Sequence, residues 1–192
     1  IASHSDSPSL KIKENPEMVE NGYVKLNVEL YGGALLAPWF DRPLSVAGRL
    51  IVKEAEQICE KLVTVDKDML MIPNLAIHMN REINKGVELN RQKDMLPVFG
   101  LEDSEEFLTR LAERLQVKKE DILEYELGLY NTDTGDYLGL SEEFISSPRL
   151  DNLTSVQAIT TAMIEGGRER GINVAAYFDH EEIGSRTKQG AG

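Results

Sequence analysis

Near the end of the chain, a run of four ionisable residues, Asp179-His180-Glu181-Glu182, follows an apolar stretch. That stretch, residues 172–177, has the length and β-branched content of a buried strand. Open α/β sheets place their ligand sites at the carboxyl ends of strands. There, one of two adjacent carboxylates can hold a metal ion while its neighbour takes a proton from a bound water. The alternative interpretation is a solvated acidic loop after a strand.

His4 and Asp6 form a second candidate pair at the other end of the chain. In an extended strand, residues two apart project from the same face. The Asp6 carboxylate would therefore lie beside the His4 imidazole and fix its tautomer, as is usual for a metal-bound histidine. A surface pair without a function is the alternative. Pro8 is expected to end or divert this strand.

Two single residues complete the candidate set. Asp151 precedes a predicted helix that runs to about Glu165, so it is either a ligand or the helix N-cap. His78 stands among apolar neighbours and, taken alone, is typical of a satisfied core or surface histidine. A two-metal hydrolase needs a bridging carboxylate, ligands for each ion and an unbound base. Four residues have the right types at predicted strand ends or strand-to-helix junctions, although they are too few for a complete centre: His4, Asp151, Glu181 and Glu182.

The intervening residues must fold so that these distant candidates meet. Alternation of apolar and polar residues predicts strands over 23–30, 44–52 and 122–130, and further short strands are expected over 58–65 and 69–72. Ser104 is the predicted N-cap of a helix with an apolar stripe, and residues 84–97 are predicted to form a loop or flap. Gly48 marks a bulge or a close approach within its strand. Residues 9–136 are therefore expected to form a mostly β unit, inserted between 1–8 and 137–192.

Composition excludes several classes of protein. The chain has 192 residues, of which 41% are hydrophobic and 28% are charged, as in an ordinary globular protein. It contains no apolar run near the roughly 18 residues that span a bilayer, and its net charge of −12 argues against nucleic-acid binding. A single cysteine, Cys59, suits a reducing compartment, and we expect a cytoplasmic protein.

Six segments, in this order along the chain, resemble motifs of the aspartyl aminopeptidase family of dizinc exopeptidases: 4–8, 31–34, 39–42, 72–78, 148–152 and 179–185. The resemblance implies an α/β fold, namely a partial zinc-exopeptidase-type catalytic domain formed by 1–8 and 137–192. It identifies 9–136 as the family's inserted, mostly β dimerisation domain. Members of this family are longer at both ends, so the chain is expected to be an internal portion of one.

The resemblance also implies roles for individual residues. His4 matches a ligand of one metal, and Asp6 matches the residue that orients it. Asp151 matches the carboxylate that bridges the metals, Glu182 a ligand of the second metal, and Glu181 the general base. The implied cofactor is a pair of zinc ions, with other divalent metals as the alternative. The family takes its remaining ligands from sequence that corresponds to positions beyond Gly192, so this chain supplies only part of the shell of each metal.

The implied activity is a zinc-dependent aminopeptidase that removes an N-terminal residue, Asp or Glu, from peptides. His78 matches a histidine that reaches into the active site of a neighbouring subunit, which replaces the simpler interpretation given above. The implied assembly is a homo-oligomer of dimers, which in this family build closed dodecamers, with neither nucleic acid nor membrane as a partner.

Two other functions stay open at this point. One is a catalytically inactive assembly or scaffold protein that retains the fold. The other is a glycosidase with paired acids, which is weaker because the adjacent Glu181 and Glu182 cannot easily flank a bond from two sides. Such a glycosidase would also leave His4 without a role.

Overall fold

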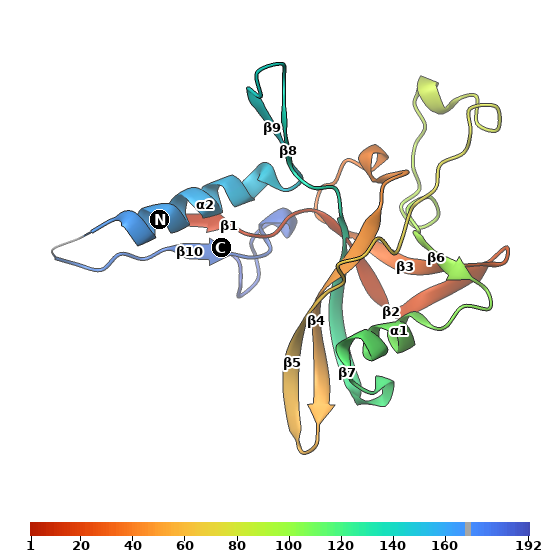
Figure 1. The fold of residues 1–192 in the computed structure, drawn as a ribbon, viewed down its shortest axis with the longest axis horizontal. Helices are drawn as coiled ribbons and strands as arrows, with labels where there is room; N and C mark the ends of the chain where they lie inside the picture. The colour runs from red at the N-terminus through yellow and green to blue at the C-terminus, as the bar shows by residue number, and fades with distance from the viewer. Residues whose placement is uncertain (168–169) are drawn as a thin grey trace. The chain divides into compact units, whose positions relative to one another are not determined.

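The computed structural model describes residues 1–167 and 170–192 (Figure 1). It divides into two compact units. Unit 1 comprises 1–8, 31–34 and 133–192, and unit 2 comprises 9–30 and 35–132. The chain therefore returns to unit 1 for only four residues, Tyr31–Ala34, between two stretches of unit 2.

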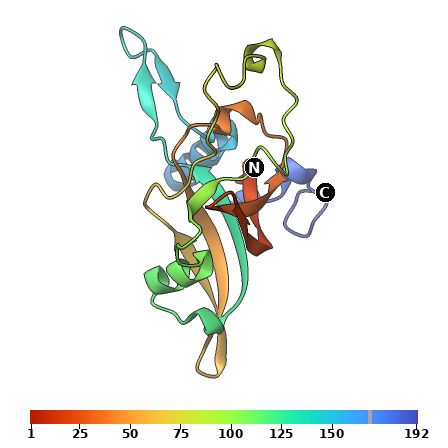
Figure 2. The same cartoon turned by 90° about the vertical axis from the view of Figure 1, so that its right-hand side faces the viewer.

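Unit 2 is built on a six-stranded sheet with the order β5-β4-β7-β2-β3-β6. Its strands are β2 (Ser9–Glu20), β3 (Tyr23–Tyr31), β4 (Leu44–Glu54), β5 (Gln57–Thr64), β6 (Val98–Leu101) and β7 (Ile122–Asn131). The pairs β2–β7, β3–β6, β4–β5 and β4–β7 are antiparallel. Figure 2 shows β4 and β5 as a long hairpin that closes at a turn over residues 55–56.

Alternation in the strands of unit 2 fills one hydrophobic core, because successive side chains of a strand point to opposite faces. In β3 the even-numbered residues Val24, Leu26 and Val28 are buried. The core also takes in Leu50, Met95, Phe107 and Leu127. The structure bears out four of the predicted strands, those near 23–30, 44–52, 58–65 and 122–130. The prediction for 69–72 was wrong, since this stretch forms isolated bridges instead of a strand.

Gly48 lets β4 approach β7 very closely. Its φ is 150°, and a Cβ built on it would lie 2.0 Å from the carbonyl oxygen of Glu126. The expectation of a close approach is therefore confirmed. The bulge itself lies elsewhere, because the register of β4 against β7 shifts between Ile51 and Val52.

Helix α1 (Phe107–Leu115) covers part of the core of unit 2. Phe107 is fully buried and meets Phe99 edge-to-face, with 5.6 Å between the ring centroids. The predicted N-cap at Ser104 was wrong. The N-cap residue is Glu106, which makes no side-chain cap, and the Phe107 N–H instead donates to the Glu17 carboxylate. A cap supplied from so far along the chain leaves no local sequence signal.

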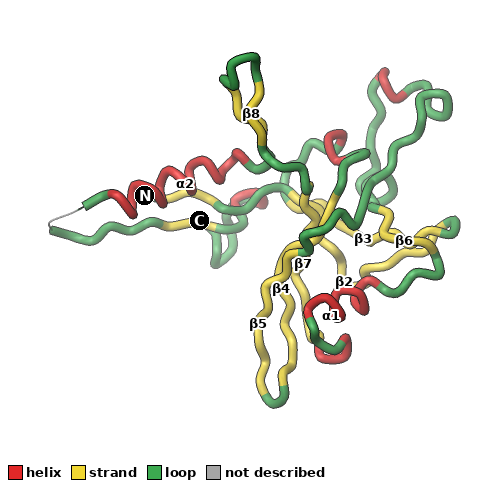
Figure 3. Tube along the Cα trace, in the orientation of Figure 1, coloured by secondary structure: helices red, strands yellow, loops and turns green. Residues whose placement is uncertain are grey.

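The chain between β5 and β6 is mostly loop, as predicted for residues 84–97 (Figure 3). Its regular part is limited to the bridges at 70–72 and a short 3₁₀ turn, η2 (Ile83–Lys85). His78 lies in this loop, in a turn over 77–79, and its side chain is exposed.

Unit 1 contains a parallel pair of strands and the longest helix of the chain. Strand β1 (Ala2–His4) pairs with β10 (Ala176–Phe178), and α2 (Leu150–Glu165) packs against β1 (Figure 1). Gly166 ends α2, where the polypeptide turns away in an extended conformation. None of the helices in the described part of the chain combines the length and the apolar content that a bilayer crossing demands.

The strand predicted over 172–177 is shorter and more exposed than expected. β10 begins only at Ala176, and Ile172 and Val174 are 84% and 63% exposed. Among the described residues, β10 pairs with β1 alone and over three residues. An apolar run indicates that burial would be favourable, but it does not indicate over how many residues the strand pairs with a neighbouring strand. The hairpin of β8 (Asp136–Leu138) and β9 (Phe144–Ser146) was not predicted.

Candidate metal centre

The centre forms where β1 and β10 end side by side. His4 is the last residue of β1 and is in register with Phe178, the last residue of β10. The pairing continues one step further, since the Ser5 N–H donates to the Phe178 carbonyl at 2.9 Å. Because the strands are parallel, the segments that follow them leave from the same edge. Residues 1–8 and the acidic run therefore meet, although about 175 positions separate them in the chain.

His4 is held between carboxylates on both of its ring nitrogens. Its Nδ1 lies 3.3 Å from Asp6 Oδ1 and 3.1 Å from the Asp6 carbonyl oxygen. Its Nε2 lies 3.2 Å from Asp151 Oδ1 and 3.9 Å from Glu181 Oε2. Both atoms near Nδ1 are acceptors, so a proton on Nδ1 is bound by Asp6, while Nε2 faces the acidic groups. Burial lowers the pKa of His4, but the hydrogen bond to Asp6 and the charges of Glu181 and Asp6 raise it overall.

Asp6 is the hub of this region. Its Oδ1 accepts the Glu181 N–H at 3.2 Å, and its Oδ2 accepts the Glu182 N–H at 3.1 Å and the Tyr31 hydroxyl at 2.7 Å. Burial raises the pKa of Asp6, but these three donated hydrogen bonds outweigh it and hold the pKa below its usual value. Asp6 is therefore a fixed anion that orients His4 and also holds the backbone of the acidic loop.

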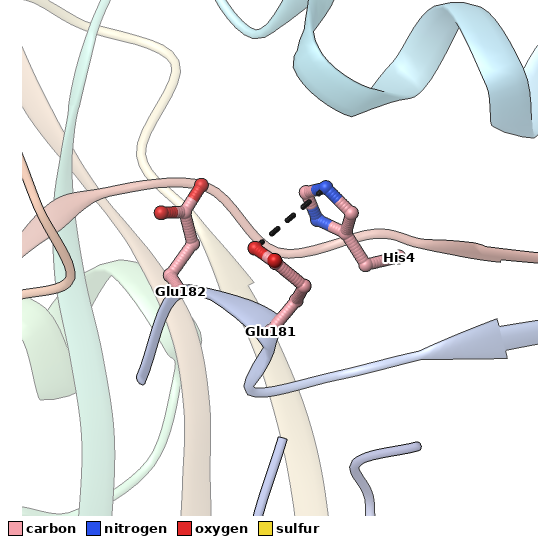
Figure 4. A group of neighbouring side chains, drawn as sticks. All are labelled: His4, Glu181 and Glu182. Carbon is pink, nitrogen blue, oxygen red and sulfur yellow. Dashed lines mark ion pairs between the residues drawn. The ribbon is translucent and has the colours of Figure 1, made fainter. Parts of the chain in front are cut away.

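His4, Glu181 and Glu182 bring one nitrogen and two carboxylate oxygens within 4.8 Å of one another. The two glutamates lie on the 3₁₀ turn η4 (Glu181–Ile183), and Figure 4 shows their carboxylates and the imidazole around a shared space. Burial raises the pKa of Glu182, and the negative charges of Glu181 and Asp6 raise it further. Crowded carboxylates of this kind are stabilised by a cation, and imidazole with carboxylate is a ligand set that zinc accepts.

Asp151 joins the group through His4, and its side chain is 89% exposed. The alternative interpretation as an N-cap was wrong: the N-cap of α2 is Arg149, and it makes no side-chain cap. Asp151 and Asn152 have non-helical dihedral angles at the start of α2, and the peptide bond between them is cis.

The structure thus brings together five of the six predicted site residues, all of which belong to unit 1: His4, Asp6, Asp151, Glu181 and Glu182. The sixth, His78, belongs to unit 2. His180 is turned to another partner, because its Nδ1 lies 2.7 Å from Thr187 Oγ1.

The sequence did not predict a role for two residues of the centre, Gly32 and Tyr31. Gly32 belongs to the family-like segment 31–34 but was given no role of its own, yet its φ is 80°, and a Cβ there would lie 2.9 Å from the Cβ of Glu182. Tyr31 donates to Asp6 and was not assigned a role. Burial, followed by the hydrogen bond to Asp6, raises the pKa of Tyr31, so its hydroxyl remains a donor. The available signals were the Tyr-Gly-Gly run directly after an alternating strand and the resemblance of segment 31–34 to a family motif.

Comparison with known proteins gives one consistent family. The family described as Aminopeptidase I zinc metalloprotease (M18) matches residues 1–192. A "Probable M18 family aminopeptidase 2" of Clostridium novyi is 47% identical over 200 residues, which is 100% of this chain and 46% of that protein. The chain therefore spans about half the length of the curated relatives it matches.

Solved structures agree with this family. The structure named as the Ape4 and Nbr1 complex matches with a TM-score of 0.92 at 34% identity, over 99% of this chain and 42% of that one. The S. cerevisiae mApe1 dodecamer matches with a TM-score of 0.80 at 25% identity, over 99% of this chain and 45% of that one.

Proposed function

Because the chain belongs to the M18 family of zinc metalloproteases, we propose that the full-length protein is a metalloaminopeptidase that removes the N-terminal residue of peptides. The observation that carries this proposal is the convergence of His4, Glu181 and Glu182 within 4.8 Å at the ends of β1 and β10. Asp6 binds the backbone of the acidic loop and the imidazole of His4 at the same time, which is not expected of a solvated surface loop without a function.

In this proposal His4, Asp151 and Glu182 hold zinc, with two ions per active site. The donor set supports it, since neutral imidazole and carboxylates are common zinc ligands. The electrostatics support it as well, because the raised pKa of Glu182 reflects burial and nearby negative charge that a cation would offset. A bound zinc ion supplies Lewis acidity, which lowers the pKa of a coordinated water toward neutrality.

Glu181 is the proposed general base. Its side chain is 52% exposed, so its carboxylate is open to substrate and water, while its own N–H is tied to Asp6. Glu181 takes a proton from the attacking water as the water oxygen bonds to the carbonyl carbon after the first residue. It returns that proton to the amine as the C–N bond breaks, so no net proton is consumed in this exchange.

The finer parts of the proposal concern substrate and assembly. We propose a preference for Asp or Glu as the first residue, and a homo-oligomer in which His78 of one subunit reaches the active site of another. The dodecamer of the S. cerevisiae relative supports the assembly. The cytoplasm is the proposed compartment, in keeping with the single Cys59.

The test is to purify the full-length protein, measure its zinc content, and follow hydrolysis of short peptides that begin with Asp, Glu or Leu. We expect bound zinc and turnover that a chelator abolishes and added zinc restores. Faster turnover of the Asp and Glu peptides would support the acidic preference. A zinc-free, inactive full-length protein would contradict the proposal and favour the scaffold alternative.

Replacing Gly32 by Ala in the full-length protein should weaken zinc binding about tenfold, the lower end of what residues behind the ligands contribute. The added Cβ would lie 2.9 Å from the Cβ of Glu182, and the positive φ of 80° is unfavourable for Ala. A competition titration against a fluorescent chelator measures the effect. Gly33→Ala is the matched control, because a Cβ there meets nothing within 4 Å. Equal zinc affinity in both variants would contradict the prediction.

A further inference from the structure

We propose that Tyr31 is a positioning residue of the metal centre, which acts through Asp6 on both His4 and the Glu181–Glu182 loop. This inference rests on the proposed function, since it concerns the same centre. Its starting point is the four-residue return of the chain, Tyr31–Ala34, to unit 1 between two stretches of unit 2.

The contact that carries the inference is the hydrogen bond from the Tyr31 hydroxyl to Asp6 Oδ2, at 2.7 Å. The same Oδ2 accepts the Glu182 N–H, while Oδ1 accepts the Glu181 N–H and lies 3.3 Å from His4 Nδ1. A carboxylate can rotate about its bond to Cβ, and such rotation would break these contacts together. The other partners of Asp6 belong to β1 and to the acidic loop, whereas Tyr31 comes from a third segment of the chain. Its hydroxyl therefore resists rotation of the carboxylate.

Tyr31 is itself well fixed, as a positioning residue must be. It is only 9% exposed, and its ring meets His180 edge-on with 6.2 Å between centroids. The next residue, Gly32, lies against Glu182 closely enough to leave no room for a Cβ. Tyr31 and Gly32 thus support the acidic loop at two points, one through Asp6 and one directly.

Metal binding by His4 and proton transfer by Glu181 do not by themselves require a hydroxyl hydrogen-bonded to Asp6. A metal-bound His4 needs one acceptor on Nδ1, which Asp6 provides, and the hydrogen bond from Tyr31 to Asp6 is an additional contact. If Tyr31 served only to fill space, removing its hydroxyl would change zinc affinity and kcat little, because the ring would remain. The role of the hydroxyl is therefore separable from that of the ring by experiment.

The experiment is a double-mutant cycle in the full-length protein, with Tyr31→Phe, Asp6→Ala and the double variant. Zinc affinity is measured by competition with a fluorescent chelator, and kcat and KM are measured on the best peptide at saturating zinc. We expect Tyr31→Phe to weaken zinc binding about tenfold. We expect the fold-decrease of kcat in Tyr31→Phe to be larger than the fold-change of KM. In the Asp6→Ala background, the same change should alter zinc affinity less than about twofold.

Tyr125→Phe is the matched control. Tyr125 also donates its hydroxyl to nearby acceptors, the backbone carbonyls of Lys13 and Glu14, but it belongs to unit 2. We expect it to lower the unfolding midpoint and to leave zinc affinity unchanged. Unfolding midpoints in the presence of chelator show whether each variant folds, so that loss of structure is not read as loss of positioning.

Two results would overturn the inference. One is wild-type zinc affinity and kcat in Tyr31→Phe; the other is an equal loss of affinity with and without Asp6, which would mean that Tyr31 does not act through it. Either result leaves the proposed function intact if the wild-type protein binds zinc and cleaves peptides. If the wild type does neither, the proposed function itself fails.

Discussion

Replacing Glu181 by Gln in the full-length protein should lower kcat by about 10²- to 10⁴-fold, the usual contribution of a general base. The amide has nearly the shape of the carboxylate, but it cannot take the proton from water. Asp6 binds the backbone N–H of residue 181 and not its side chain, so the loop should keep its position. Zinc content should therefore stay close to that of the wild type.

The neighbouring variant, Glu182→Gln, is the control for this experiment. It makes the same chemical change one residue along η4, at a proposed ligand instead of the proposed base. We expect Glu182→Gln to lose zinc affinity and Glu181→Gln to lose turnover at full zinc occupancy. Metal analysis and steady-state kinetics on both variants separate the two roles. Near-normal kcat in Glu181→Gln would show that the base is another residue.

The second large effect is on stability. Gly48→Ala should lower the free energy of unfolding by about 4 kcal/mol, from backbone strain of about 1–3 kcal/mol together with an overpacking cost of similar size. The added Cβ would lie 2.0 Å from the Glu126 carbonyl oxygen, and this is backbone that cannot move without separating β4 from β7. Denaturant unfolding, followed by circular dichroism, measures the change.

Gly22→Ala is the control, because Gly22 also has a positive φ, 79°, but a Cβ there meets nothing within 4 Å. It isolates the cost of the backbone conformation, which we expect to be about 1–2 kcal/mol. If both variants were destabilised equally, the close approach of β4 and β7 would not be the cause of the loss.

The parts of the fold that could be predicted are those that depend on a local pattern. β3, β4 and β7 carry buried apolar residues two positions apart, such as Leu50 and Val52 in β4 and Leu127 and Leu129 in β7, and their sequences show this spacing. β2 was not predicted, because Pro16 and several charged residues interrupt its alternation. The cap of α1 could not be predicted either, since Glu17 supplies it from a distant part of the chain.

The candidate site divides in the same way. The residue types and the spacing of His4 and Asp6 predicted an imidazole beside a carboxylate, and the structure has that pair. The second task of Asp6, holding the N–H groups of Glu181 and Glu182, depends on a contact across some 175 positions. No local pattern encodes such a contact, and the same is true of the hydrogen bond from Tyr31, which lies 25 positions from Asp6.

The pairing of β1 with β10 joins Ala2 to Ala176, and this has a consequence for the order of events during synthesis. All strands of unit 2 leave the ribosome before β10 does, so the sheet of unit 2 can form while His4 still lacks its carboxylate neighbours on η4. Closing so long a loop is slow, because the chain loses conformational entropy before the pairing of β1 with β10 contributes any stabilisation. The metal centre would then be completed late, after the six-stranded sheet of unit 2.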